Sequence, residues 1–208
     1  MVLSPVLEPP SPSFSPSLPI PLHPPESELK TPLLRTRKAQ LHDAGAIHHL
    51  IDSFTHDNTL LSRSYAEICD NIHTFTIVET SSGQFIGCAA LHVYGQHLAE
   101  IRSIVVDPKT QKTGAGSLLV RTLLDQAEAR RIKCVCLFTR IPAFFQHFYF
   151  RVVERQTLPD KVRKDCIHCT RRNACDEIAM AIGELPDSLL ASNFYPSRRH
   201  ADLVQLQL

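Results

Sequence analysis

Apolar residues recur along the chain with two different periods, and these periods predict strands and helices. Short runs in which apolar residues alternate or cluster are typical of strands, and they occur at residues 33–38, 75–79, 85–93, 99–106 and 134–139. A last strand is expected at 176–182. Apolar residues at helical spacing predict a helix after Asp43, which is a good helix cap, and a longer helix at 114–130. Shorter helices are expected at 64–71 and 143–148.

The order of these elements predicts the fold class. A strand, two helices, several strands, and then a helix, a strand and a short helix form an α/β (α+β) pattern. This order implies a mixed, mostly antiparallel central sheet flanked by helices, with a parallel portion where strand, helix and strand follow one another.

Both ends of the chain lack such periodicity. Residues 1–32 are dominated by proline and serine and offer little apolar surface to bury, so we expect a disordered tail there. A plastid-type transit peptide is the alternative, which the absence of arginine from this stretch disfavours. We therefore expect one folded domain at 33–183, followed by a C-terminal tail at 184–208.

Composition narrows the partners that this chain is expected to have. A chain of 208 residues can bury the core of one domain, and a formal net charge of +1 gives no general reason to expect nucleic-acid or membrane binding. No apolar run is long enough to span a bilayer. Seven cysteines without a secretory signal favour reduced thiols and a cytoplasmic protein, with organellar targeting as the alternative. We expect a small-molecule substrate, and the composition does not decide between a monomer and a homo-oligomer.

A loop with two glycines, residues 111–116 (QKTGAG), stands between an expected strand and an expected helix. Gly114 and Gly116 let the backbone approach a ligand closely, and unpaired N–H groups at a helix start supply donors to an anion. Lys109 or Lys112 would add positive charge. The pattern predicts a pyrophosphate site, with an ordinary tight turn as the alternative. It lacks both the Lys-Ser/Thr of a P-loop and the three glycines of a dinucleotide fingerprint.

Through this loop the sequence resembles the GNAT superfamily of N-acetyltransferases, whose acetyl-CoA loop reads Gln/Arg-x-x-Gly-x-Gly/Ala. Residues 104–108 are similar to the superfamily's fourth strand and residues 134–139 to its fifth, and the resemblance covers about 37–150. It implies that these two strands splay apart, so that the co-substrate acetyl-CoA can bind between them. The residues expected to bind it are Ile104, Val106, Gln111, Lys112, Thr113, Gly114, Ala115 and Gly116.

A narrower resemblance concerns the acetyl acceptor. Segments similar to the acetyltransferase domain of bacterial N-acetylglutamate synthases occur in the same order at residues 37–43, 60–64, 87–91, 99–103 and 137–140. This resemblance implies transfer of an acetyl group to L-glutamate at the entry to arginine biosynthesis. The kinase-like domain of longer synthases has no counterpart in these 208 residues, so regulation by arginine through that domain is not expected.

Such a transfer needs a base and cations. The α-amino group of glutamate is mostly protonated at neutral pH, and Glu100 lies where several GNAT enzymes carry a glutamate base. A strand residue paired with Arg102 or another cation is the alternative interpretation of Glu100. Arg37, Arg63 and Arg140 each lie in a segment that resembles the synthases, and arginine holds a carboxylate with two parallel hydrogen bonds. We expect these three to bind the substrate, with a solvated surface role as the alternative for each.

The group that would protonate the leaving thiolate stays unassigned. Phe145 stands where many GNAT enzymes carry a tyrosine, and Tyr149 replaces a glycine that is usual in the family, which should alter the turn. His92 is either a basic residue of the site or a satisfied histidine near the end of the sheet. Two other functions therefore stay open, namely acetyl transfer to a different amine and a non-catalytic CoA- or metal-binding regulator.

Three cysteines cluster near the C-terminal end of the expected domain. Cys166, Cys169 and Cys175 include a C-x2-C pair of the kind found in zinc sites, but the second pair is missing, and no metal is assigned. Short synthases carry a similar Lys-Asp-Cys-x-x-Cys segment, so the pattern supports the resemblance without revealing a role. Five basic residues nearby are expected to lie in a solvated loop, with contacts to CoA as the alternative, namely Lys161, Arg163, Lys164, Arg171 and Arg172.

Overall fold

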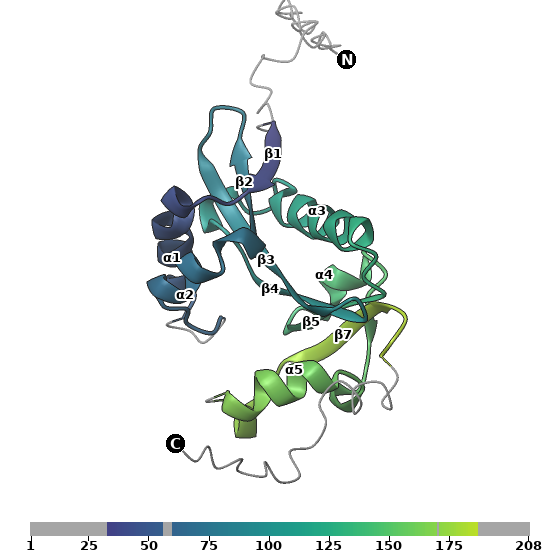
Figure 1. Ribbon diagram of the computed structural model, residues 1–208. Coiled ribbons are helices and arrows are strands. Elements are labelled where there is room, and N and C mark those ends of the chain that lie inside the picture. Colours follow the sequence, from purple (N-terminus) through teal and green to yellow (C-terminus); the bar gives the residue numbers. More distant parts are fainter. Residues whose placement is uncertain (1–32, 56–59, 170, 187–208) are drawn as a thin grey trace, which may run out of the picture. The chain divides into compact units, whose positions relative to one another are not determined.

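The structure is a computed structural model in which residues 33–55, 60–169 and 171–186 are described (Figure 1). The expected N-terminal tail at 1–32 and most of the expected C-terminal tail at 184–208 lie outside the described residues. In the part of the chain that is described, no helix has the length and apolar character needed to cross a membrane.

A seven-stranded sheet forms the centre of the domain. Its strand order is β1-β2-β3-β4-β5-β7-β6, and only the β4–β5 pair is parallel, as the mixed pattern predicted. The strands are β1 (Leu34–Lys38), β2 (Phe75–Thr80), β3 (Phe85–Gly95), β4 (Leu98–Val106), β5 (Cys134–Thr139), β6 (Arg151–Val152) and β7 (Ile178–Gly183).

Five α-helices and six short 3-10 helices in the described residues surround the sheet. The α-helices are α1 (Ala44–Asp52), α2 (Tyr65–Asp70), α3 (Ala115–Ala129), α4 (Pro142–Gln146) and α5 (Pro159–Lys164). The 3-10 helices are η1 (Leu41–Asp43), η2 (Ile72–Thr74), η3 (Pro108–Thr110), η4 (Arg155–Thr157), η5 (Cys166–His168) and η6 (Arg172–Ala174).

The helices divide between the two faces of the sheet (Figure 1). On one face, Leu119 and Leu123 of α3 pack in a buried cluster with Ile101 of β4. On the other face, Ile47 of α1 and Ile68 of α2 pack in a second buried cluster with β2, β3 and β4. Because each face has its own apolar core, side chains on β4 that point in opposite directions enter different chemical surroundings.

A β-bulge in β4 determines which side chains enter which face. The pairing of β3 with β4 shifts between Cys88 and Ala90, and Ser103 adopts a left-handed backbone with φ +52°. Before the bulge, Ile101 belongs to the core under α3, whereas after it Val105 belongs to the core under α1 and α2. The extra residue of a bulge produces this change of alternation.

The parallel strands β4 and β5 separate soon after they begin to pair. Within the described residues they pair only at Ala99 with Val135 and at Glu100 with Cys136, although β4 continues to Val106. This confirms the splayed fourth and fifth strands that the family resemblance implied. Backbone groups of β4 beyond Glu100 on the side of β5 therefore stay available to a ligand.

The structure differs from the sequence prediction in the C-terminal third of the chain and at Asp43. The segment expected as a solvated basic loop contains α5, in which Lys161 is mostly buried with a side chain that is 11% exposed. The last strand begins at Ile178 rather than two residues earlier. Asp43 does precede α1, but its carboxylate accepts hydrogen bonds from Arg37 and from the Gln40 N–H instead of capping α1. In α5, the ion pair of Lys161 with Glu100 of β4 overrides the local pattern.

Candidate functional site

The glycine loop lies directly before the N-terminus of α3. Gly114 is the N-cap of this helix, and its φ of +90° lies in the left-handed region that glycine adopts without strain. The Thr113 hydroxyl donates a 2.7 Å hydrogen bond to the carbonyl oxygen of Thr110, which ties the loop to the turn before it. The first N–H groups of an α-helix have no partner within the helix, so this end of α3 offers donors to an anion.

The same loop approaches β4 and α4. A Cβ atom added at Gly116 would lie 3.5 Å from Phe144 Cζ and 3.9 Å from Val106 Cγ2, so the start of α3 lies beside the end of β4. Ile104 and Val106 pack at the border of the core under α3. The structure thus brings the expected loop and the expected strand residues together on the α3 side of the sheet.

Glu100 lies at the point where β4 and β5 separate, and it is only 2% exposed. Its Oε1 atom accepts a hydrogen bond from Lys161 Nζ at 2.7 Å, and Tyr94 OH lies 2.9 Å from its Oε2 atom. The cation paired with Glu100 is therefore Lys161 of α5 rather than Arg102. A buried carboxylate with an ion pair and a second hydrogen bond avoids most of the cost of burial.

Asp165, just after α5, closes a network around Glu100. Its Oδ2 atom lies 2.9 Å from Lys161 Nζ, 2.9 Å from Tyr94 OH and 3.7 Å from Arg102 Nη1. Burial alone would raise the pKa of Asp165, but Lys161, Tyr94 and Arg102 lower it overall. Asp165 is therefore a carboxylate at neutral pH.

Lys161 and Tyr94 of this network hold their protons at neutral pH, whereas the nearby His92 does not take up a second one. Burial lowers the pKa of Lys161, but the Glu100 and Asp165 carboxylates outweigh it and raise the pKa above its usual value. Burial, followed by the charges of Glu100 and Asp165, raises the pKa of Tyr94 far above its usual range. Burial, followed by the charge of Arg102, lowers the pKa of His92, which therefore stays neutral near pH 7. At neutral pH the network contains an ammonium and a neutral phenol.

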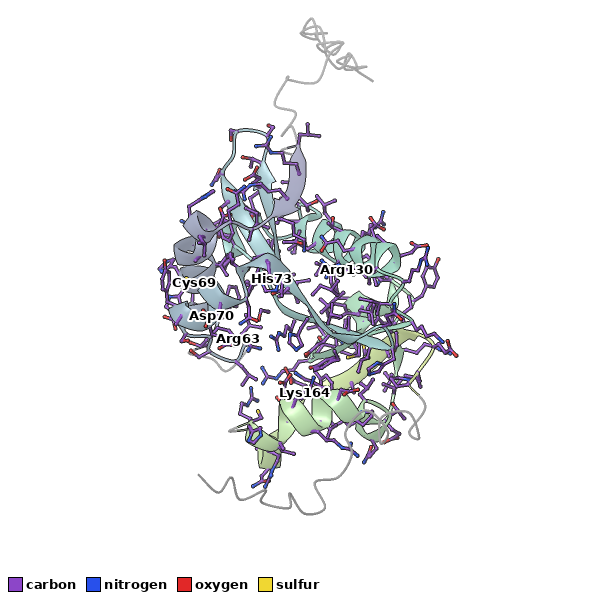
Figure 2. The ribbon with its side chains drawn as sticks, in the orientation of Figure 1. Arg63, Cys69, Asp70, His73, Arg130 and Lys164 are labelled. Atoms are coloured by element: carbon purple, nitrogen blue, oxygen red, sulfur yellow. The ribbon has the colours of Figure 1, made fainter. Side chains whose placement is uncertain are left out.

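A small pocket brings two arginines together next to this network. Arg63 lies just before α2, where its Nη1 atom pairs with Glu67, and Arg102 lies two residues after Glu100 on the same strand. Their side chains are 20% and 14% exposed. Figure 2 shows Arg63 at the end of α2 that faces Lys164 of α5. The pocket is lined by Arg63, Glu67, Ile68, Asn71, Phe75, Arg102 and Ser103.

The other two expected substrate arginines lie elsewhere. Arg37 on β1 donates to Asp43 at 2.7 and 2.9 Å and to Glu79 at 3.2 Å, and β2 and β3 separate its strand from β4. Arg140 follows β5, and its Nε atom lies 2.8 Å from a carboxylate oxygen of Asp176. Neither lines the pocket of Arg63. The sequence alone did not identify Arg102 as a pocket residue, although its spacing of two from Glu100 was a usable signal.

The position that many GNAT enzymes use for a tyrosine acid is apolar here. Phe145 is 2% exposed, and its ring packs edge to face with Phe144 and Phe150. Tyr149 is 83% exposed and adopts a left-handed backbone with φ +66°, a conformation that glycine adopts without strain. No proton donor therefore comes from Phe145.

The C-terminal cysteines are free thiols that are partly exposed. Cys169 and Cys175 line a second small pocket together with Leu61, two residues before Arg63. Within the described ranges, no group of three or more His, Cys, Asp or Glu side chains is arranged to hold a metal ion. The segment therefore contacts the chain next to the arginine pocket without forming a recognisable metal centre.

Known proteins resemble this chain at three levels. Residues 44–150 match the Acetyltransferase (GNAT) family. An uncharacterized N-acetyltransferase of Chlorobaculum tepidum is 35% identical over 144 residues, which are 69% of this chain and 92% of that protein. An amino-acid acetyltransferase of Mycobacterium tuberculosis is 31% identical over 120 residues, which are 57% of this chain and 68% of that protein.

Solved structures resemble the domain as well. N-acetylglutamate synthase from Neisseria gonorrhoeae, complexed with coenzyme A and N-acetyl-glutamate, superimposes with a TM-score of 0.66 and 26% identity. The match covers 74% of this chain but only 36% of the synthase chain. The likeness therefore concerns one part of that protein.

Proposed function

Since this chain belongs to the GNAT acetyltransferase family and uses acetyl-CoA as its co-substrate, we propose that it transfers the acetyl group to the α-amino group of L-glutamate. The observation that carries this proposal is the pocket lined by Arg63 and Arg102, of which Arg102 lies two residues after Glu100 on β4. Two guanidinium groups suit an acceptor with two carboxylates, because arginine binds a carboxylate through two parallel hydrogen bonds.

The two faces of the sheet support separate positions for the two substrates. The loop and the N-terminus of α3 are suited to bind the pyrophosphate of acetyl-CoA, and the unpaired edge of β4 near Ile104 and Val106 is suited to bind the arm that follows. Glu100 and Arg102 alternate with Ile101 and so project toward the opposite face. The acceptor amine would therefore reach the thioester through the gap between β4 and β5.

Glu100 is the proposed general base. Its carboxylate takes a proton from the ammonium of the bound amino acid, and the free amine then attacks the thioester carbonyl. A base at this position needs a fixed geometry, which the bonds from Lys161 and Tyr94 provide. Tyr94 is a poor acid for the departing thiolate, because its pKa is far above its usual range. Solvent is the proposed proton source, since a thiol has a pKa of about 8.5.

The product would be N-acetylglutamate, and the reaction would stand at the entry to arginine biosynthesis. The relatives named amino-acid acetyltransferase support this assignment, at about one third identity. Free thiols throughout the described chain agree with a reaction in the cytoplasm.

An acceptor screen tests the proposal. Purified protein is mixed with acetyl-CoA and one amine at a time, and CoA release is followed with a thiol reagent, with a blank lacking acceptor to correct for the protein's own cysteines. The amines are L-glutamate, L-glutamine, L-aspartate, L-lysine and spermidine. We expect the highest kcat/KM with L-glutamate. With L-glutamine, which lacks the second carboxylate, kcat/KM should be lower by about tenfold or more. Turnover with another amine and none with L-glutamate would refute the proposal.

A further inference from the structure

The proposed role of Glu100 as the base requires that its carboxylate lose a proton after each turnover. Each turnover would leave one proton on its carboxylate, and this proton must reach water before the next acceptor can be deprotonated. The Glu100 side chain is only 3% exposed, and an acceptor bound in the adjacent pocket would cover it further. The protein therefore needs a path along which this proton leaves.

Tyr94 lies between Glu100 and a carboxylate that reaches solvent. Its hydroxyl oxygen is 2.9 Å from Glu100 Oε2 and 2.9 Å from Asp165 Oδ2, although a phenol carries a single hydrogen. The Asp165 side chain is 33% exposed, about ten times the exposed fraction of the Glu100 side chain. Three oxygen atoms in hydrogen-bond contact thus run from the buried base toward water.

We propose that Tyr94 relays the proton from Glu100 to Asp165, from which it passes to solvent. The protonated Glu100 gives its proton to the phenol oxygen while the phenol O–H gives its own proton to Asp165 Oδ2. Asp165 then releases that proton to water, and the Tyr94 hydroxyl, whose hydrogen now points to Glu100, rotates back toward Asp165. The net result is one proton moved from Glu100 to solvent, with Tyr94 and Asp165 unchanged.

Lys161 cannot replace Tyr94 in this role, although it contacts the same two carboxylates. Its Nζ atom is 2.7 Å from Glu100 Oε1 and 2.9 Å from Asp165 Oδ2. An ammonium has no lone pair and cannot accept a proton before it gives one up, whereas a hydroxyl accepts and donates at the same time. Lys161 instead holds both carboxylates in place, and its charge keeps Asp165 ionised between turnovers.

The remaining titratable groups near Glu100 are not part of the line of hydrogen bonds that joins it to Asp165. His92 of β3 contacts the Tyr94 ring at a centroid distance of 4.8 Å, and burial with the charge of Arg102 keeps its pKa low. Cys136 of β5 is a buried thiol whose pKa is raised well above its usual value, first by burial and then by Glu100. The Tyr94 ring is held from the other side by Lys164, whose Nζ lies 5.2 Å from the ring centroid. A phenylalanine ring would keep both ring contacts.

The test uses Tyr94→Phe, which removes only the hydroxyl. The kcat is measured with L-glutamate, or with the amine that gives the highest rate in the acceptor screen, at constant pH and ionic strength. The concentration of a small buffer, imidazole, is raised in one series and that of a bulky buffer, HEPES, in another. We expect Tyr94→Phe to lower kcat by about tenfold or more at the lowest buffer concentration, and imidazole to restore most of the rate more effectively than HEPES.

Controls separate a relay from a structural role. The wild type and Tyr149→Phe, which removes an exposed hydroxyl, should show no dependence on either buffer. Asp165→Asn blocks the exit of the same path and should also become dependent on imidazole. A kcat for Tyr94→Phe equal to that of the wild type at the lowest buffer concentration would overturn the relay. A reduced kcat that no buffer restores would also overturn it, because lost geometry cannot be supplied by a proton carrier.

The variant Glu100→Gln separates failure of this inference from failure of the proposed base. Loss of activity in Glu100→Gln together with a buffer-independent Tyr94→Phe rejects the relay and leaves the base in place. Full activity of Glu100→Gln rejects both. Thermal melting of each variant is recorded in parallel, so that a fall in kcat is assigned to folded protein.

Discussion

Two networks of carboxylates and cations, each with a buried glutamate, are chemically similar but lie in different parts of the sheet. In the first, Glu79 of β2 and Asp43 before α1 share Arg37. In the second, Glu100 of β4 and Asp165 after α5 share Lys161. Glu79 and Glu100 are 3% and 2% exposed, so burial does not distinguish them.

The difference lies in the backbone around each network. Glu79 has a pairing partner on both sides, Arg35 of β1 and Phe85 of β3, and the ladder with β1 continues beyond it. Glu100 is the last residue of β4 that pairs with β5, and a pocket with Arg63 lies two residues farther along β4. A buried ion pair inside a continuous sheet only joins elements, whereas one at the point where a sheet opens can also meet a ligand.

The largest effect should come from the matched substitutions Glu100→Gln and Glu79→Gln. Both keep the size of the side chain and remove its charge. We expect Glu100→Gln to lower kcat/KM by about 10²–10⁴-fold, because the amide cannot accept the ammonium proton. Glu79→Gln should leave kcat/KM within about twofold, because Glu79 touches neither substrate. Steady-state kinetics on folded protein measures both, and equal losses in the two variants would remove the distinction between the networks.

The next largest effect should distinguish Arg63 from Arg37, which the sequence presented as equal candidates for binding the substrate. Arg63→Ala should raise the KM for L-glutamate by roughly 10–100-fold, since a hydrogen bond between charged groups contributes about 1.5–3 kcal/mol. Arg37→Ala should leave this KM unchanged and lower the free energy of unfolding by about 2 kcal/mol, a value reduced because Arg37 is one-third exposed. Glutamate titrations and urea unfolding measure these effects. A raised KM in Arg37→Ala alone would reverse the assignment.

The two networks should also affect how the stability of the protein depends on pH. Hydrogen bonds from Arg37 lower the pKa of Asp43, and Lys161 lowers that of Asp165 against the effect of burial. Each contribution is complete above the unfolded value of 3.8 and is lost as the pH falls through the lower folded pKa. The raised pKa of Lys161 acts at the other end, since its contribution is lost as the pH rises above 10.5.

Melting temperatures between pH 2 and 11 measure these contributions. Asp43→Asn should flatten the acid limb and leave the alkaline limb as it is in the wild type. Lys161→Met should flatten the alkaline limb. An unchanged acid limb in Asp43→Asn would show that the Arg37 network does not contribute to acid stability.

The smallest effect should come from the turn after α4. Tyr149 adopts a left-handed backbone at the surface, which costs a residue with a Cβ atom about 1–2 kcal/mol. Tyr149→Gly should raise the free energy of unfolding by about 0.5–1 kcal/mol after the greater freedom of glycine in the unfolded chain is counted. Urea unfolding measures the change, and kcat should not move. A loss of stability would mean that the exposed ring contributes more than the backbone strain costs.

The sequence predicted the parts of the fold that depend on local pattern. The strand at 134–139 and the helix that became Ala115–Ala129 were found because apolar periodicity and a glycine start are local signals. The loop with Gly114 and Gly116 was predicted to precede this helix for the same reason, and α3 does begin there. Helix α5 was missed because its residues are mostly charged, and only a partner on β4 explains why Lys161 is buried.

The candidate site depended on information that a single sequence does not contain. The sequence shows three arginines of equal polarity, Arg37, Arg63 and Arg102. Only the tertiary structure shows that Arg63 and Arg102 share a pocket, whereas Arg37 lies on β1 at the edge of the sheet. Tyr94 gave no signal at all, because its meaning comes from Asp165, which is 71 residues away. Which side chains pair across such distances along the chain depends on the tertiary structure.

The bulge at Ser103 limits the changes in length that β4 can undergo in evolution. Because the extra residue sets the alternation on either side, the length of β4 matters more than the identity of the residue at the bulge. Asn or Gly tolerates a left-handed backbone and should be accepted at position 103. A one-residue deletion there would turn either Glu100 and Arg102 or Val105 to the wrong side of the sheet. Insertions and deletions in this family should therefore be rare at this point, even where substitutions are frequent.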